Sequence, residues 1–186
     1  MDRLLSCFLY AAPLAAAVML STAVYCLLPG RTACGERSRR LLMLTLGLLA
    51  AALVLRLAGS WVLAACGLAW RGWVCSLLGL ACLLLAGVGI FQTLDCWLAP
   101  GCVHRLPTQI LVGISALTLL GVLVTLGLPS WFLSHCPERV LDWEGQTLVQ
   151  VDHGFLDPDY SYYMYCGPLV RGSEPVEAGE TPPVFQ

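Results

Sequence analysis

Four long apolar runs dominate the first 133 residues of the chain, and short polar segments separate them. The hydrocarbon core of a bilayer is about 30 Å thick, so a helix needs roughly 20 apolar residues to cross it. Each run reaches that length. The pattern therefore predicts an all-α membrane protein, a four-helix transmembrane bundle with spans at about 4–29, 41–61, 73–94 and 107–132.

The first run also fits a second interpretation. It follows Arg3 and leads to Ser21, Thr22 and Ala23, which are small residues typical of a signal-peptide cleavage site. Cleavage there would remove residues 1–23. The run stays apolar beyond Ala23, and this extra length favours an uncleaved membrane anchor.

The polarity of the chain changes at residue 134. The segment 134–186 holds nine of the twelve acidic residues, and only Arg139 and Arg171 balance them. Residues 140–151 fit either a short strand or a short helix, and the Thr147–Val151 stretch alternates weakly. The Pro, Gly and Glu content after Gly167 is typical of disorder. We expect a four-span region at 1–133 and a soluble, acidic, partly disordered C-terminal tail at 134–186.

Composition supports a membrane location. The chain is 58% hydrophobic and 12% charged, whereas soluble domains carry about 25% charged residues. Too little polar surface is present to coat a water-soluble globule, so the bilayer is the first expected partner. The acidic tail and nearly neutral spans argue against nucleic-acid binding. Other membrane proteins, or a second copy of the chain, are the remaining candidate partners.

Arginines predict the orientation, because short arginine-rich loops usually stay cytoplasmic. The first connection carries four of them, and the third adds Arg105. On the other side lie Arg3, Arg71 and Arg139. The majority places both termini away from the cytoplasm, in the endoplasmic reticulum or the plasma membrane. The four arginines of the first connection, our topology signal, are Arg31, Arg37, Arg39 and Arg40.

The same arginines allow two further interpretations. Residues 37–40 read Arg-Ser-Arg-Arg. In the cytoplasm this string resembles an endoplasmic-reticulum retention signal, and in the lumen it resembles a furin-type cleavage site. A cleaved signal peptide would place this loop outside the cytoplasm, against the arginine rule.

Arg56 is a charge inside an otherwise apolar span. A charge at the bilayer centre costs at least ~2.5–3.5 kcal/mol, so such residues often have a function. Pairing with Asp95, or a polar pathway, would be such a role. Arg56 also lies five positions before Trp61, and an arginine stem can extend its charge to the interface. We expect this anchoring role and keep the functional charge as the alternative.

Cysteines are abundant, at ten in 186 residues. Cys136 and Cys166 both lie in the tail, and if the tail is lumenal their disulfide would close a loop worth about 3–4 kcal/mol. In the opposite orientation Cys96 and Cys102 become the candidate pair. Neither these residues nor His104 shows the C-x₂₋₄-C spacing of structural zinc sites. We expect no metal and no other cofactor.

The chain carries no G-x-S-x-G, H-E-x-x-H or P-loop motif, so we expect no enzyme. Small residues four apart share helix faces and permit close helix packing; such pairs are Ala12 and Ala16, Gly47 and Ala51, and Cys82 and Ala86. The sequence predicts a small multi-pass membrane protein that is non-catalytic and acts through lateral association as an accessory or organising subunit. The alternative is a channel or transporter subunit in which Arg56 is an intramembrane functional charge.

The tail contains a tyrosine-rich segment at 157–166. Exposed tyrosines make good contact surfaces because they bury large area at low entropic cost. The other interpretation is that this segment packs back on the rest of the chain.

Overall fold

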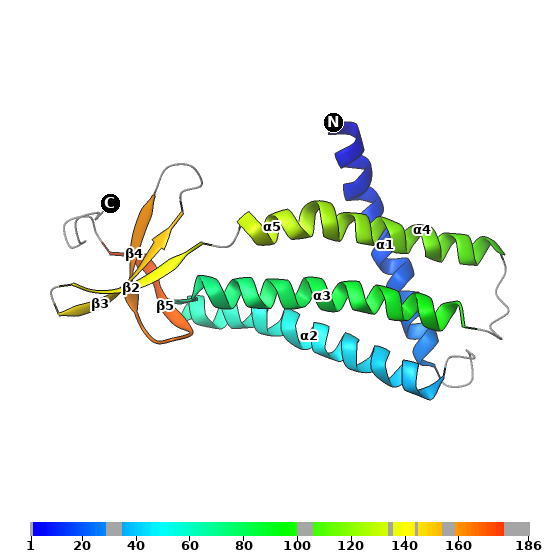
Figure 1. Cartoon of the computed structure of the whole chain (residues 1–186), viewed down its shortest axis with the longest axis horizontal. Coiled ribbons are helices and arrows are strands. Elements are labelled where there is room, and N and C mark those ends of the chain that lie inside the picture. The colour runs from blue at the N-terminus through cyan, green and yellow to red at the C-terminus, as the bar shows by residue number, and fades with distance from the viewer. Residues whose placement is uncertain are drawn as a thin grey trace. The chain divides into compact units, whose positions relative to one another are not determined.

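A computed structural model describes residues 2–28, 35–99, 106–133, 136–143, 145–153 and 159–176, with side chains from residue 12 onward. Figure 1 shows long helices and one sheet. The elements are α1 (Asp2–Leu27), α2 (Glu36–Ala65), β1 (Leu68–Trp70), α3 (Gly72–Trp97), α4 (Leu106–Val122), the π-helical turn η1 (Leu123–Gly127), α5 (Leu128–Leu133), β2 (Glu138–Trp143), β3 (Gln146–Asp152), β4 (Tyr160–Tyr165) and β5 (Val170–Pro175).

Three of the predicted spans are helices that are long and apolar enough to cross a membrane. They run over Glu36–Ala65, Gly72–Trp97 and Leu106–Phe132. The helices begin or end a few residues outside the apolar runs because helical hydrogen bonding continues into the flanking polar residues. α1 is helical over 26 residues, and its described apolar part is the shorter stretch Ala12–Leu27.

The chain divides into two compact units, with the division falling inside α2, α3 and α5. Unit 1 contains Met1–Ala51 and Ala81–Ser130, and unit 2 contains Ala52–Leu80 and Trp131–Gln186. Unit 1 is helical. Unit 2 combines helical segments with all of the strands.

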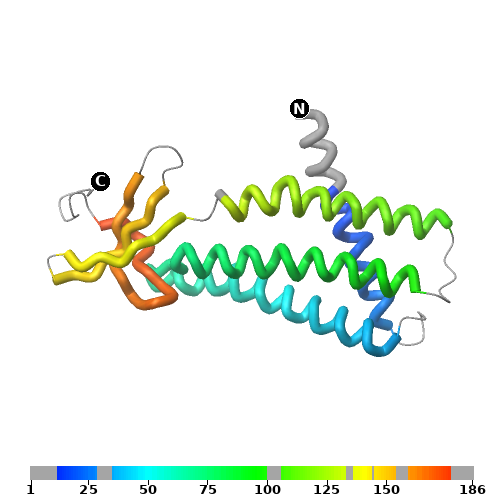
Figure 2. The backbone as a smooth tube through the Cα atoms, viewed as in Figure 1, coloured from blue at the N-terminus to red at the C-terminus, as the bar shows by residue number. Residues whose placement is uncertain are grey.

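The core of unit 1 forms where α1 packs on α4, and Figure 2 shows the two helices crossing. Met19 of α1 and Ile90 of α3 meet Val112 and Ala116 of α4 in one buried cluster. These side chains lie at most 7% exposed. The helices of this unit therefore share an apolar interior as well as apolar outer faces.

Unit 2 contains a five-stranded antiparallel sheet in the order β1-β5-β4-β3-β2. Its edge strand β1 comes from the connection between α2 and α3, and it pairs with the last strand, Leu68 opposite Gly172 and Trp70 opposite Val170. The sheet buries Leu148, Val149, Val151 and Tyr162.

The sheet corrects two predictions. The fold is mostly helical but not all-α, and β5 occupies part of the segment after Gly167 that we expected to be disordered. The alternation of apolar and polar residues in the strands is weak, and β1 is separated from β5 by about a hundred residues. The local sequence pattern therefore does not predict the pairing. The tyrosine-rich segment forms β4, with Tyr162 in the sheet core. Residues 177–186 lie outside the described residues.

Truncating a buried strand residue should loosen the sheet. Leu148 is 1% exposed whereas Leu169 is 48% exposed. Leu148→Ala should lower the free energy of unfolding by about 2–5 kcal/mol because it leaves a cavity. Leu169→Ala, the same change at the surface, should cost within about 0.5 kcal/mol. Hydrogen exchange of the β2–β4 amides measures both, and equal exchange rates in the two variants would contradict the sheet core.

Candidate functional site

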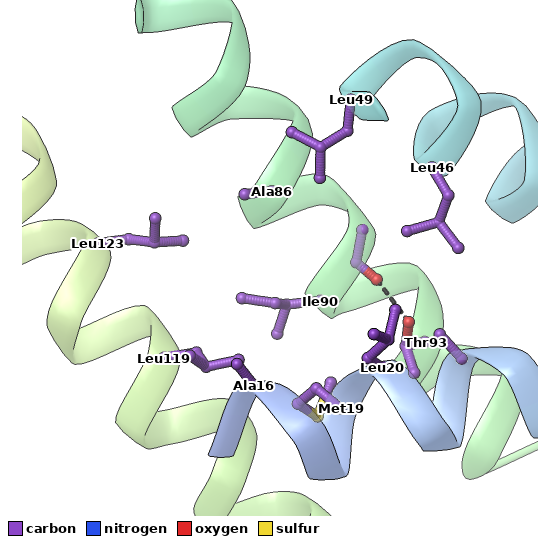
Figure 3. A pocket seen from close by; sticks show the side chains of 12 residues that line it. Ala16, Met19, Leu20, Leu46, Leu49, Ala86, Ile90, Thr93, Leu119 and Leu123 are labelled. Carbon is purple, nitrogen blue, oxygen red and sulfur yellow. Dashed lines mark hydrogen bonds between the residues drawn. The ribbon is translucent and has the colours of Figure 1, made fainter. Parts of the chain in front are cut away.

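An apolar cavity of about 310 Å³ lies among the helices of unit 1. Figure 3 shows side chains from several helices pointing toward one space. Ala16 and Met19 of α1, Leu49 of α2 and Ile90 of α3 belong to its wall. Among the described lining residues Thr93 alone carries a hydroxyl, and it donates to the Gly89 carbonyl at 2.7 Å. The cavity therefore offers a ligand apolar contact and no free polar group.

A π-helical turn lies in the fourth apolar stretch, at Leu123–Gly127. Leu123 lines the cavity. A Cβ at Gly127 would lie 2.6 Å from Cδ2 of Leu83, so glycine allows α3 to approach at this point. π turns inside α-helices occur often at functional sites. The sequence alone gave no signal for this turn.

A charged cluster joins the strands of unit 2 to the start of α3. Glu138, only 4% exposed in its side chain, accepts the Gly72 N–H at 2.6 Å and Arg71 Nε at 3.0 Å. Arg171 Nε lies 4.0 Å from the same carboxylate, and its guanidinium sits 3.7 Å from the Tyr163 ring centroid. Gly72 is the first residue of α3, where backbone N–H groups lack helical partners. Glu138 thus acts as an acidic cap that favours the positive end of the helix dipole.

Sequence reasoning missed this cluster because each member had a simpler explanation. Arg71 was counted for orientation, and Glu138 and Arg171 were counted as part of the acidic tail. No spacing in the sequence relates these three residues, since Arg71 lies between β1 and α3, Glu138 in β2 and Arg171 in β5.

Arg56 lies against the first turns of α3. A Cβ at Gly79 would be 3.0 Å from Arg56 Nη1 and 3.3 Å from Trp131 Cδ1. The Trp131 indole donates to the Ser76 carbonyl at 2.7 Å. Asp95, the sequence-based candidate partner, belongs to unit 1 whereas Arg56 belongs to unit 2, and the pairing of Arg56 with Asp95 stays a prediction.

The candidate disulfide residues are both free thiols. Cys136 Sγ lies 3.9 Å from His153 Nδ1, and the Cys166 thiol donates to the Met164 carbonyl at 3.8 Å. The strand register sets Cys136 level with the start of β4, whereas Cys166 follows the end of β4. The structure does not bring this pair together. Cys102, in the alternative pair, lies outside the described residues.

Three of the topology arginines lie at the start of α2. Arg37 and Arg40 are exposed and Arg39 is half-buried. Arg40 pairs with Glu36 at 2.6 Å in a solvent-exposed bridge. Arg31 lies outside the described residues, and the orientation stays a prediction.

Gln92 is a polar residue in α3, a helix that is long and apolar enough to cross a membrane. Its buried Oε1 has no hydrogen-bond partner among the described residues. The presence of Gln92 within an apolar run of the sequence could have marked it as a candidate contact residue, because polar side chains in lipid commonly form hydrogen bonds between helices.

Removing the acidic charge of the cluster should destabilise unit 2. Glu138→Gln leaves two largely buried arginines without a counter-charge, which should cost about 3 kcal/mol of unfolding free energy. Glu36→Gln makes the same change in the exposed Glu36–Arg40 pair and should cost at most about 0.5 kcal/mol. Denaturant unfolding followed by tryptophan fluorescence tests this difference. Equal losses of unfolding free energy in the two variants would show that the charged cluster contributes no more to stability than an exposed ion pair.

Comparison with known proteins assigns no family to the chain. No family model matches it, and neither does any curated protein or solved structure. Interpretation of the cavity, the charged cluster and Arg56 rests on their own geometry.

Proposed function

We propose that the chain is a non-catalytic multi-pass membrane protein that acts through lateral association as an accessory or organising subunit. It crosses the bilayer four times, with both termini away from the cytoplasm, in the endoplasmic reticulum or the plasma membrane. Its apolar α1 supports the fourth crossing, because Met19 packs with Val112 and Ala116 of the long α4. A proline inside α1, Pro13, is compatible with a transmembrane helix.

One face of α2 supports lateral association. Leu42 and Thr45 are buried in unit 1 and mark the inward face. At 100° per residue, Gly47 and Ala51 lie on the opposite face, and both are exposed. Leu44 beside them is 64% exposed. The outward face thus has small residues along its middle and a larger apolar side chain at its margin.

Gly47 carries the proposal. A Cβ added there would meet no atom within 4 Å, so packing inside the described chain does not require glycine at this position. Small residues on outward helix faces let a second helix approach closely, and such contact drives association in lipid. A partner transmembrane helix would fill the space beside Gly47 and Ala51.

Enlarging this face should break the association. A photo-crosslinking residue placed at Leu48, 59% exposed, should yield discrete protein adducts in native membranes. Ala51→Leu should weaken them about tenfold, because overpacking costs roughly 1–3 kcal/mol. Ala50→Leu is the matched control: it lies next to Ala51, is also exposed, and points 100° away.

Adducts to lipid alone would overturn lateral association through this face. An equal loss of protein adducts in Ala51→Leu and Ala50→Leu would also contradict it, because the loss would then not depend on the outward face. Adducts between copies of the chain indicate self-association, and adducts of another defined mass indicate a different membrane protein.

The alternative, a channel or transporter subunit, depends on Arg56. Its position beside Trp131 and Gly79 supports anchoring instead, since arginine and tryptophan both favour the membrane interface. We expect Arg56→Leu to leave expression and membrane insertion close to wild type, with Arg56→Lys as the charge-preserving control. Conductance in reconstituted wild type that disappears in Arg56→Leu at unchanged expression would support the alternative.

A further inference from the structure

We infer that the cavity of unit 1 is a binding site for one hydrocarbon chain of a membrane lipid. This inference concerns an open pocket between the helices of unit 1, whereas the proposed association concerns the outward face of α2, so either holds without the other. The cavity volume of about 310 Å³ lies at the lower end of the range for ligand pockets, roughly 300–1,000 Å³.

Small residues create the space. Ala16 and Ala23 of α1 and Ala86 and Gly89 of α3 line it, and Figure 3 labels Ala16 and Ala86 among the lining side chains. Larger side chains at these positions would fill the volume from within the chain. An unfilled void costs the lining atoms their dispersion contacts, so an occupant that restores those contacts stabilises the helices.

The chemistry of the wall selects the occupant. The side chains that line it are aliphatic apart from the Met19 thioether and Thr93, and the Thr93 hydroxyl already donates to Gly89. Water would find few polar partners among these side chains, and the pocket is open to the surroundings at the exposed Ala16 and Leu20. Within membrane-spanning helices the abundant apolar material is the lipid chain.

The π-helical turn is a second, independent observation at the same place. Its first residue, Leu123, lines the cavity, so the helix widens at the wall of the proposed site. π turns are rare and recur at functional positions. Leu83 packs at Gly127, which holds the far end of the turn against α3.

Photo-labelling tests the site directly. The full chain is reconstituted in vesicles of phosphatidylcholine doped with a phosphatidylcholine that carries a diazirine midway along one acyl chain. Adducts should concentrate on peptides containing Ala16 and Leu123, about tenfold above those containing the exposed Leu44. Ala16→Phe, which fills the cavity, should remove this excess at unchanged melting temperature. Ala17→Phe, at the adjacent alanine that does not line the cavity, should keep it.

Each other outcome overturns the inference. Uniform labelling of cavity and outer peptides would show ordinary lipid contact, and an excess that persists in Ala16→Phe would place the chain elsewhere. A photoactivatable sterol that labels the cavity and displaces the acyl-chain label would assign the site to sterol. If Ala16→Phe fails to fold, Ala86→Phe fills the same space from α3. The positions of the adducts in the wild-type chain test lipid binding at the cavity independently of either variant.

Discussion

The carboxylate of Glu138 is the contact on which the arrangement of unit 2 depends. It accepts a hydrogen bond from the first N–H of α3 and from Arg71, in surroundings where an unpaired charge would be costly. Because Arg71 directly follows β1, the contact connects β2 to the turn between α2 and α3. The pairing of β1 with β5 then extends this connection along the edge of the sheet.

Small residues act differently on the two sides of the helices in unit 1. Lipid tails are as apolar as leucine, so burial of apolar surface does little to bring helices together, and close packing decides which contacts form. A Cβ at Gly47 would meet no atom of the described chain within 4 Å. Ala16 and Gly89 instead line an open pocket of about 310 Å³ between the helices.

The helices followed from the sequence because hydrophobic length is a local property. The runs at 41–61 and 73–94 became α2 and α3 with the ends displaced by only a few residues. The sheet was not predicted, since its edge strand is three residues long and its partner strand lies beyond two further apolar stretches. Glu138 could not be recognised for the same reason: its partners Arg71 and Gly72 are local neighbours of each other but not of Glu138. The cavity and the π turn depend on how side chains from several helices fit, which no single-helix pattern specifies.

Counting arginines along the sequence predicted an orientation but not the ion pairs, because the arginines differ in burial and in neighbours. Arg40 forms an exposed bridge within one helix, and such pairs contribute little to stability. Arg71 and Arg171 instead share a carboxylate that is almost fully buried. Arg56 belongs to neither group, because its Nη1 lies close to Gly79, as does Cδ1 of Trp131. Equal formal charges thus have three different surroundings, and what separates them is the burial and the neighbours that folding gives each one.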